Sequence, residues 1–317
     1  MSRQRLGRIL RPALATVLAV GALLLLGWLL HQAPGVTPRG APYRDLPAFR
    51  VWAVVCAVAI VTSFAVAVAL WRSDPAWRGP AWREPERGLL RWAPHLLYGV
   101  LVVLIYLAER AFLALDLKPP LPAQVVLRLA SLFVLGALAA SPMVLGLWRA
   151  YGWLRERTGR LEGPNPAVRP EGVVVGELRR VGRYAQRCLA GLAVLLTVGV
   201  VQTGVLRQAL LAAGYPTEQF PASWLLLHGA FLAAVLLLVY LPFFLAWRSY
   251  VTGLVEVFYP VPEAGLPTDD WIGDRERLER ILQGNSTLKQ NLSAAFGVLA
   301  PLGGSLMGLV LPGLKKG

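Results

Sequence analysis

Six apolar runs, each close to the length of a membrane-crossing helix, constrain the fold of this chain more than any other feature. About 20 apolar residues in a helix cross the ~30 Å of hydrocarbon in a bilayer. The runs are rich in Ala, Leu and Val and lack the alternating pattern of barrel strands. They cover residues 10–30, 51–71, 95–115, 126–148, 188–209 and 224–247. We therefore predict an all-α polytopic membrane protein, with six transmembrane helices arranged as three hairpins in a bundle over residues 1–250.

The composition agrees with a membrane protein rather than a soluble one. Hydrophobic residues make up 56% of the chain and charged residues only 16%, whereas soluble domains carry about 25% charged residues. Four arginines lie before or at the start of the first run, as basic residues also do before the core of a secretory signal peptide. Its apolar core is longer than that of a signal peptide, and no small-residue cleavage site follows it. We expect residues 10–30 to be a retained helix.

The positions of the basic residues predict the orientation. If the N-terminus is cytoplasmic, 25 of the 32 Lys and Arg residues fall in cytoplasmic segments and five fall in outer loops, while Arg110 and Arg128 lie inside spans. Cytoplasmic loops of membrane proteins carry such an excess. We therefore predict cytoplasmic N- and C-termini. A bacterial inner membrane fits the retained first helix and the short outer loops. Orientation explains most of the net charge of +14 without a nucleic-acid partner.

A repeated Trp-Arg dipeptide closes three of the apolar runs on the predicted cytoplasmic side. Tryptophan favours the headgroup zone, where its ring is in an apolar layer and its N–H can find an acceptor. An arginine just beyond it meets anionic lipid phosphates. The pairs that we expect to anchor the bundle at the lipid interface are Trp71-Arg72, Trp148-Arg149 and Trp247-Arg248.

A small helical tail is predicted over residues 251–317. An amphipathic helix is expected over 269–283, with Thr268 or Asp269 as its N-cap. Two i,i+4 ion pairs should support it, namely Arg275–Glu279 and Glu276–Arg280. The stretch 287–314 is apolar but contains several Pro and Gly residues, so we expect a helical hairpin packed on the cytoplasmic face or the inner leaflet. A re-entrant segment is the alternative.

Two basic segments on the same side are candidates for binding lipid or a partner. The loop 73–92 combines Trp and Arg residues, and we expect it to lie flat on the inner leaflet. The segment 176–187 should begin the fifth helix below the membrane and place four arginines on neighbouring turns. Such a face suits anionic lipid, although an ordinary charged helix start is the simpler interpretation of 176–187. Binding of a cytoplasmic protein is the alternative.

Charged residues inside the spans are the candidate site. An ionisable group in hydrocarbon costs several kcal/mol and usually has a function or a partner. Glu109 and Arg110 lie in the third span and Arg128 in the fourth, all in the outer half. Glu109 and Arg128 are close enough in depth to form an ion pair, and both arginines could instead reach the outer headgroups. Two polar residues of the outer half, Gln202 and His228, could line an outward-opening cavity with them.

Motifs for catalysis or metal binding are not found. The sequence has no phosphate-binding loop, and its three histidines are too far apart along the predicted bundle to share a metal. We predict neither enzyme activity nor a cofactor. Cys56 and Cys188 should differ in depth by roughly 20 Å, too far for a disulfide, so we expect both to be small core residues.

Two classes of function fit these features. The first is a small transporter or channel-like protein, which could act as a homo-oligomer, with a polar site in the outer half of the bundle. The second is a non-catalytic membrane subunit or scaffold whose tail and basic loops bind a cytoplasmic partner or anionic lipid. Transporters often contain helices broken near the middle of the bilayer. Pro142 and Pro242 lie in the inner halves of their spans, which favours neither class.

Overall fold

Six α-helices make up the computed structural model, which describes residues 37, 42, 45–73, 93–113, 123–161, 171–261 and 267–283. The backbone alone is described at 70–73 and 109–113 and at the starts of the helices that begin at 123 and 171. Every regular element in these ranges is helical, which confirms the all-α prediction. The helices are α2 (Pro47–Ser73), α3 (Ala93–Leu113), α4 (Ala123–Leu161), α5 (Glu171–Ala213), α6 (Ala222–Phe258) and α7 (Asp269–Gln283).

Four of these helices are long and apolar enough to cross a membrane. They are α2, α4, α5 and α6, and α3 contributes a shorter apolar helix over Ala93–Ala108. Large apolar side chains are exposed on the outside of α3, where lipid would cover them, including Leu96, Leu97, Val100, Val103, Leu104 and Leu107. The structure therefore agrees with a membrane protein. The predicted span 10–30 and hairpin 287–314 lie outside the described residues, so the count of six spans and the three-hairpin arrangement stay predictions.

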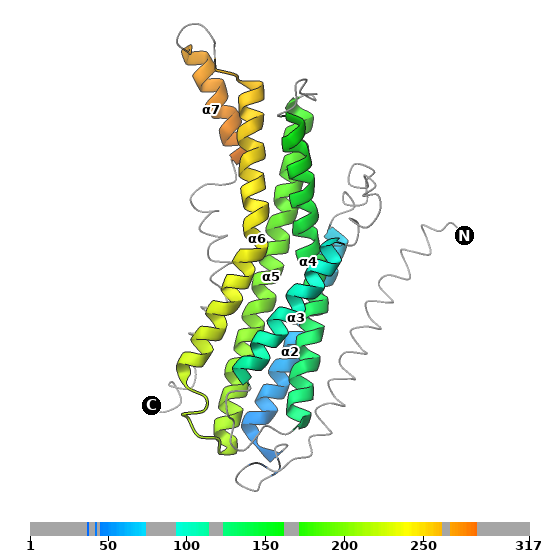
Figure 1. The fold of residues 1–317 in the computed structure, drawn as a ribbon, viewed down its shortest axis with the longest axis vertical. Coiled ribbons are helices and arrows are strands. Elements are labelled where there is room, and N and C mark those ends of the chain that lie inside the picture. Colours follow the sequence, from blue (N-terminus) through cyan, green and yellow to red (C-terminus); the bar gives the residue numbers. More distant parts are fainter. Residues whose placement is uncertain are drawn as a thin grey trace, which may run out of the picture.

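The helices form an elongated bundle in which α4, α5 and α6 extend together past α2 and α3 (Figure 1). Helix α5 has 43 residues, which corresponds to about 65 Å of helix and is roughly twice the thickness of the hydrocarbon layer. Helix α7 lies against the extended end of α6 (Figure 1). We call this end the α7 end, and the opposite end, which carries the connection between α5 and α6 at residues 214–221, the turn end.

The extension of α4 departs from the sequence-based expectation. The fourth apolar run ends at residue 148, but α4 continues without interruption to Leu161. The physical reason is that 150–161 contains no Pro and is rich in Leu, Arg and Glu, which favour helix. The prolines of the connection to α5 lie only beyond that point. Helix α5 likewise begins at Glu171, five residues earlier than the predicted start at 176.

The α7 end contains a continuous hydrophobic core built by α4, α5, α6 and α7. Two glycines let the helices approach closely there. The ring of Trp247 lies against Gly182 of α5, so that a Cβ at residue 182 would be 2.9 Å from Cη2 of that ring, and Tyr184 occupies the corresponding space beside Gly146. The most deeply buried side chains of this core are Met143, Leu147, Leu154, Leu178, Val181, Leu254 and Leu278.

Helix α7 covers Asp269–Gln283, the range expected for the amphipathic helix. The Thr268 hydroxyl accepts a hydrogen bond from the Trp271 N–H at 3.3 Å, which confirms Thr268 as the N-cap. Both predicted ion pairs are present, at 3.4 Å for Arg275–Glu279 and 3.5 Å for Arg280–Glu276. Leu282, with Leu278, is buried against the neighbouring helices, so the apolar face of α7 completes the core of the α7 end.

The turn end is closed by a tight connection between α5 and α6. Gly214 adopts a φ of 103° just after α5, a conformation that glycine accepts without strain. The Arg207 Nε–H donates to the carbonyl oxygen of Phe220 at 2.6 Å. The rings of Tyr215 and Phe220 pack edge to face at 5.9 Å. These contacts fix the angle at which α6 leaves α5, and they set the distance between these two helices beside the candidate site.

Candidate ligand cavity inside the bundle

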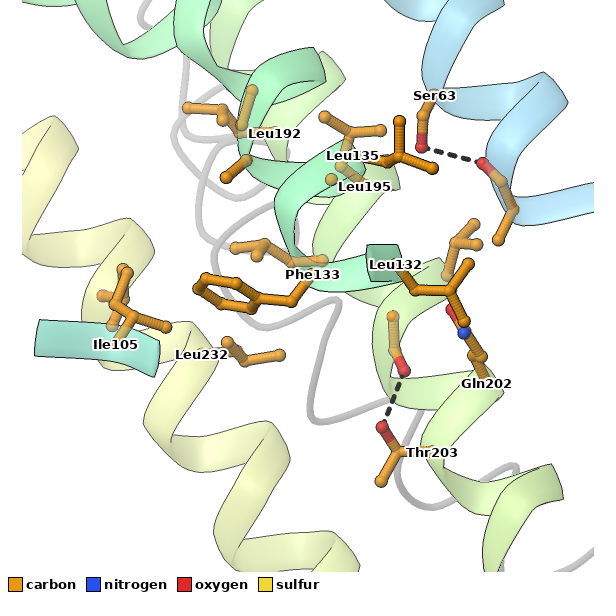
Figure 2. A pocket seen from close by; sticks show the side chains of 18 of the residues that line it. Ser63, Ile105, Leu132, Phe133, Leu135, Leu192, Leu195, Gln202, Thr203 and Leu232 are labelled. Atoms are coloured by element: carbon orange, nitrogen blue, oxygen red, sulfur yellow. Dashed lines mark hydrogen bonds between the residues drawn. The ribbon is translucent and has the colours of Figure 1, made fainter. Parts of the chain in front are cut away.

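A cavity of about 250 Å³ lies between helices α2, α3, α4, α5 and α6. Its lining extends from Leu192 to Leu206 on α5 and from Leu129 to Val144 on α4, which corresponds to a length of roughly 20 Å along the helices. Figure 2 shows Ile105, Phe133 and Leu232 on one side of the cavity, and Gln202 and Thr203 on the other. Most of the lining is apolar, so the space suits an apolar chain more than a hydrated ion.

Several polar side chains of the lining already have backbone partners. The Ser63 hydroxyl donates to the Ala59 carbonyl at 2.7 Å, and the Thr203 hydroxyl donates to the Gly199 carbonyl at 3.0 Å. The Tyr98 hydroxyl of α3 donates to the Ala137 carbonyl of α4. These groups are satisfied within the protein and do not require a ligand.

A second set of polar groups gathers toward the turn end. The Gln202 amide donates to the Cys56 sulfur at 3.2 Å, which joins α5 to α2. Trp52 lies one turn before Cys56 on α2. Arg128 of α4 lies between Val125 and Leu129, which pack in the same hydrophobic cluster as Trp52 and Cys56. We call Trp52, Cys56, Arg128 and Gln202 the outer polar cluster.

Two hydrogen-bond donors of the outer polar cluster have no partner among the described residues. They are Nε1 of Trp52 and Nη1 of Arg128, and both atoms are buried. Trp52 is 1% exposed and Arg128 is 4% exposed. Buried donors are normally paired, because an unpaired one loses its bond to water without replacement. The cluster therefore has spare capacity for a group that accepts hydrogen bonds.

The sequence-predicted site residues fall in different places. Gln202 and His228 line the cavity, and the His228 ring stacks on Trp224 with ring centroids 6.0 Å apart. Arg128 is buried beside the lining rather than in it. The side chains of Glu109 and Arg110 lie outside the described residues. The Glu109–Arg128 ion pair therefore stays a prediction.

Two of the three predicted interface pairs, Trp148-Arg149 and Trp247-Arg248, lie within long helices, whereas Trp71-Arg72 lies at the end of α2. Trp148 and Trp247 are half-buried, and Trp148 contacts the ring of Tyr98 at 6.5 Å. Arg149 and Arg248 are exposed just beyond them. The side chains of Trp71 and Arg72 are outside the described residues. Each described tryptophan thus packs against a neighbouring helix while its arginine faces outward. Binding of lipid by these residues stays a prediction.

Two glycines and helix α3 are features of the cavity that the sequence did not indicate. Gly136 and Gly199 line the space, and a Cβ added at either would meet no atom within 4 Å. Among the described helices, α3 packs mainly against α4. Besides the Tyr98 hydrogen bond, the contact between Tyr106 and Phe133 at 5.5 Å holds it there. No pattern in the sequence distinguishes a glycine beside a cavity from one beside a packed ring.

Metal ligands do not cluster in the part of the chain that the structure describes, where no three His, Cys, Asp or Glu side chains lie together. Cys56 and Cys188 are both free and buried, which confirms the prediction of two unpaired core cysteines. Comparison of the chain with protein-family models, curated proteins and solved structures finds no match. The function must therefore be inferred from the geometry of the cavity.

Proposed function

We propose that this protein binds an apolar or amphipathic small molecule in the cavity of its helix bundle and acts as a small membrane transporter. The observation that carries the proposal is the cavity itself. Five helices line it, its walls are mainly apolar, and two buried donors without a partner among the described residues lie toward one end, Nε1 of Trp52 in the lining and Nη1 of Arg128 beside it. Binding sites for small molecules commonly have this character, with apolar walls and a few placed polar groups.

Helix α3 is the proposed entrance. It covers one side of the cavity with Tyr98, Leu101, Val102 and Ile105, while its contacts with the described helices are mainly with α4. A small outward movement of α3 would open the cavity sideways to the acyl chains of the bilayer. An apolar molecule could enter by that route without crossing the headgroup layer. We propose that the α7 end faces the cytoplasm, because most basic residues lie on that side of the predicted spans.

Filling the cavity tests the proposal. Leucine at Gly136 or Gly199 would place a side chain in open space, so Gly136→Leu and Gly199→Leu should fold normally. Each should weaken binding of an uncharged probe, a pyrene-labelled long-chain alcohol, by about tenfold or more, since each fills part of the space that the chain needs. Fluorescence titration of the purified protein in detergent measures the affinity.

The matched control is Gly99→Leu. Gly99 lies on the exposed side of α3, has no atom within 4 Å of an added Cβ, and does not line the cavity. This variant should bind the probe as the original protein does. Unchanged binding in both cavity variants would contradict the proposal. For the transport step, proteoliposomes with the original protein should move the probe between leaflets faster than proteoliposomes with Gly199→Leu.

A second candidate function, a membrane subunit that binds a cytoplasmic partner, is favoured by the α7 end. Helices α4, α5 and α6 continue well past α2 and α3 there (Figure 1). Arg179, Arg180 and Arg183 of α5 are exposed on this extension. Purification from native membranes in mild detergent tests this candidate. A protein recovered in constant proportion, and lost when the three arginines are changed to Gln, would support it.

A further inference from the structure

We infer that the molecule bound in the cavity is an amphipathic anion, with a carboxylate or phosphate head held by the outer polar cluster and one long apolar chain along the cavity. This inference rests on the proposed function and names the chemical class of its ligand. It follows from which hydrogen-bonding groups of the cluster are still unpaired, and from the distribution of polar and apolar residues along the cavity.

The unpaired groups are donors. A guanidinium has five N–H groups, no acceptor and a permanent positive charge. Arg128 is 4% exposed and one of its terminal nitrogens has no partner among the described residues. The Trp52 indole N–H, which can also only donate, is likewise buried without a partner among the described residues. Two unpaired donors, one of them charged, match an oxyanion and repel an amine.

The cluster adjoins the cavity rather than lying apart from it. Trp52 and Gln202 are part of the lining. The Gln202 amide donates to the Cys56 sulfur, and the α4 residues on either side of Arg128, Val125 and Leu129, pack in one hydrophobic cluster with Trp52 and Cys56. An anionic head beside Trp52 and Gln202 would therefore lie near the guanidinium. Burial makes this interaction stronger, because a charge in an apolar region has little competition from water.

The rest of the cavity fits the chain of such a molecule. From the cluster toward the α7 end, the lining on α4, α5 and α6 becomes apolar and reaches Val144, Leu192 and Val239. Tyr98, the polar side chain that α3 contributes to the described lining, uses its hydroxyl on a backbone carbonyl. Near Val144, Leu192 and Val239, a second polar group on the ligand would meet no unpaired polar side chain of the described lining. A single polar head is therefore expected.

Competition among long-chain compounds with different heads tests the inference. Hexadecyl phosphate, palmitate, hexadecanol and hexadecylamine would each displace the pyrene-labelled alcohol from the purified full-length protein. We expect the phosphate and palmitate to bind at least about tenfold more tightly than hexadecanol, and hexadecylamine to bind most weakly. The four compounds share one chain, so the order reports the head alone.

The variant Arg128→Met should remove the preference for the anions and leave the affinity for hexadecanol within about threefold of the original. Arg207→Met is the matched control. Arg207 is an arginine of the same end whose Nε–H is already used by the Phe220 carbonyl, so its loss should lower thermal stability but keep the preference. If Arg128→Met does not fold, the order of the four compounds in the original protein still decides the question.

Three outcomes would overturn the inference. They are equal binding of anions and alcohol by the original protein, a preference that survives Arg128→Met, and a preference that appears only in Glu109→Gln. The last would identify Glu109 as the counter-charge of Arg128. The proposed function fails separately, when Gly199→Leu binds every compound as the original protein does. If Gly199→Leu loses all binding but the original protein shows no preference among the head groups, the proposed function is supported and the inference of an anionic ligand is wrong.

Discussion

The two ends of the bundle use the same helices and the same small residue in opposite ways. At the α7 end, Gly146 of α4 and Gly182 of α5 each make room for an aromatic ring of the next helix. Toward the turn end, Gly136 of α4 and Gly199 of α5 face a cavity with no atom within 4 Å of an added Cβ. Glycine lets helices pack closely in one region and leaves open space between them in the other.

Arginines of the two ends also differ, because one has partners for its charge and the other has an unpaired nitrogen. At the α7 end, Arg157 of α4 pairs with Glu177 of α5 at 3.2 Å and lies over the Trp153 ring, 4.7 Å from its centroid. Toward the turn end, Arg128 is more deeply buried and has a terminal nitrogen without a partner among the described residues. Arg157 at the α7 end is thus used in contacts between and along the helices, whereas Arg128 toward the turn end keeps an unpaired donor.

The largest effect expected from this comparison is that the two ends of the bundle lie on opposite sides of the membrane. A reporter fused after Thr217, at the turn end, should be outside the cell membrane, and one fused after Pro164, between α4 and α5, should be inside. The reason is the excess of basic residues on the predicted cytoplasmic side. Fusions after Arg44 and Lys118 should also be outside, and fusions after Arg83 and Lys316 inside.

These locations are measured with a pair of reporters, one active only in the cytoplasm and one active only outside it. An external location at Pro164 would reverse the orientation assumed for the two ends. An external location at Lys316 alone would mean that the stretch 292–314 crosses the membrane. In that case the α7 end keeps its location, and only the tail beyond α7 changes.

Alanine substitution should change the free energy of unfolding in opposite directions at the two packed glycines and at the two cavity glycines. Gly146→Ala and Gly182→Ala should lower the free energy of unfolding by about 1–3 kcal/mol, since Tyr184 or Trp247 must move aside. Gly136→Ala and Gly199→Ala meet no such contact. These two variants should raise the free energy of unfolding by up to about 1 kcal/mol, because alanine favours helix more than glycine does.

Thermal unfolding in one detergent measures all four variants. Gly152→Ala is the control for the α7 end, because Gly152 lies on α4 in the same region, is exposed, and has no atom within 4 Å of an added Cβ. It should behave like the cavity variants. A similar loss of stability in all five variants would show that the difference in packing between the two ends does not exist in solution.

The sequence predicted the helices much better than it predicted the candidate site. Apolar runs and the excess of basic residues depend on composition over about 20 residues, and such averages tolerate local error. The cap at Thr268 and the pairs of α7 depend on neighbours along the chain, so they too could be predicted. The extension of α4 to Leu161 was missed because the Trp-Arg pair marks a lipid interface, and a helix can continue through it.

The cavity could not be predicted, because it depends on which faces of five helices meet. Gly146 and Gly136 are both glycines of one apolar run, and only the partner helix decides that one is filled and the other open. Gln202 and His228 were selected as polar residues of the outer half, whereas Trp52 and Tyr98 were overlooked since aromatic residues in a span are ordinarily core. Their roles depend on hydrogen bonding, because the Tyr98 hydroxyl has a partner in the Ala137 carbonyl and the Trp52 N–H has none among the described residues.

Loosening α3 should have a moderate effect. Tyr98→Phe removes the hydrogen bond to the Ala137 carbonyl, which should cost about 1 kcal/mol of unfolding free energy. If α3 is the entrance, the same change should speed both binding and release of the pyrene-labelled alcohol. Tyr106→Phe is the control, because it keeps the ring contact with Phe133 and loses no hydrogen bond that the described residues make. Faster exchange in both variants, or in neither, would argue against α3 as the entrance.

The smallest expected effect concerns the charges of the α7 end. Glu177→Gln leaves Arg157 without its counter-charge, at a site where the two side chains are 17% and 24% exposed. Glu156→Gln breaks the pair with Arg160, whose side chains are 58% and 50% exposed. Exposed pairs contribute about 0–1 kcal/mol, and removing one partner costs more as water is excluded. We expect the free energy of unfolding to fall by about 1 kcal/mol in Glu177→Gln and by less than about 0.5 kcal/mol in Glu156→Gln.

The dependence on salt distinguishes the two pairs, because salt screens exposed charges more than sheltered ones. The loss of stability in Glu177→Gln should persist in concentrated salt, while the loss in Glu156→Gln should vanish. Equal losses with equal salt dependence would mean that the α7 end is held by its apolar core alone, with Arg157 contributing through its contact with the Trp153 ring rather than through its charge.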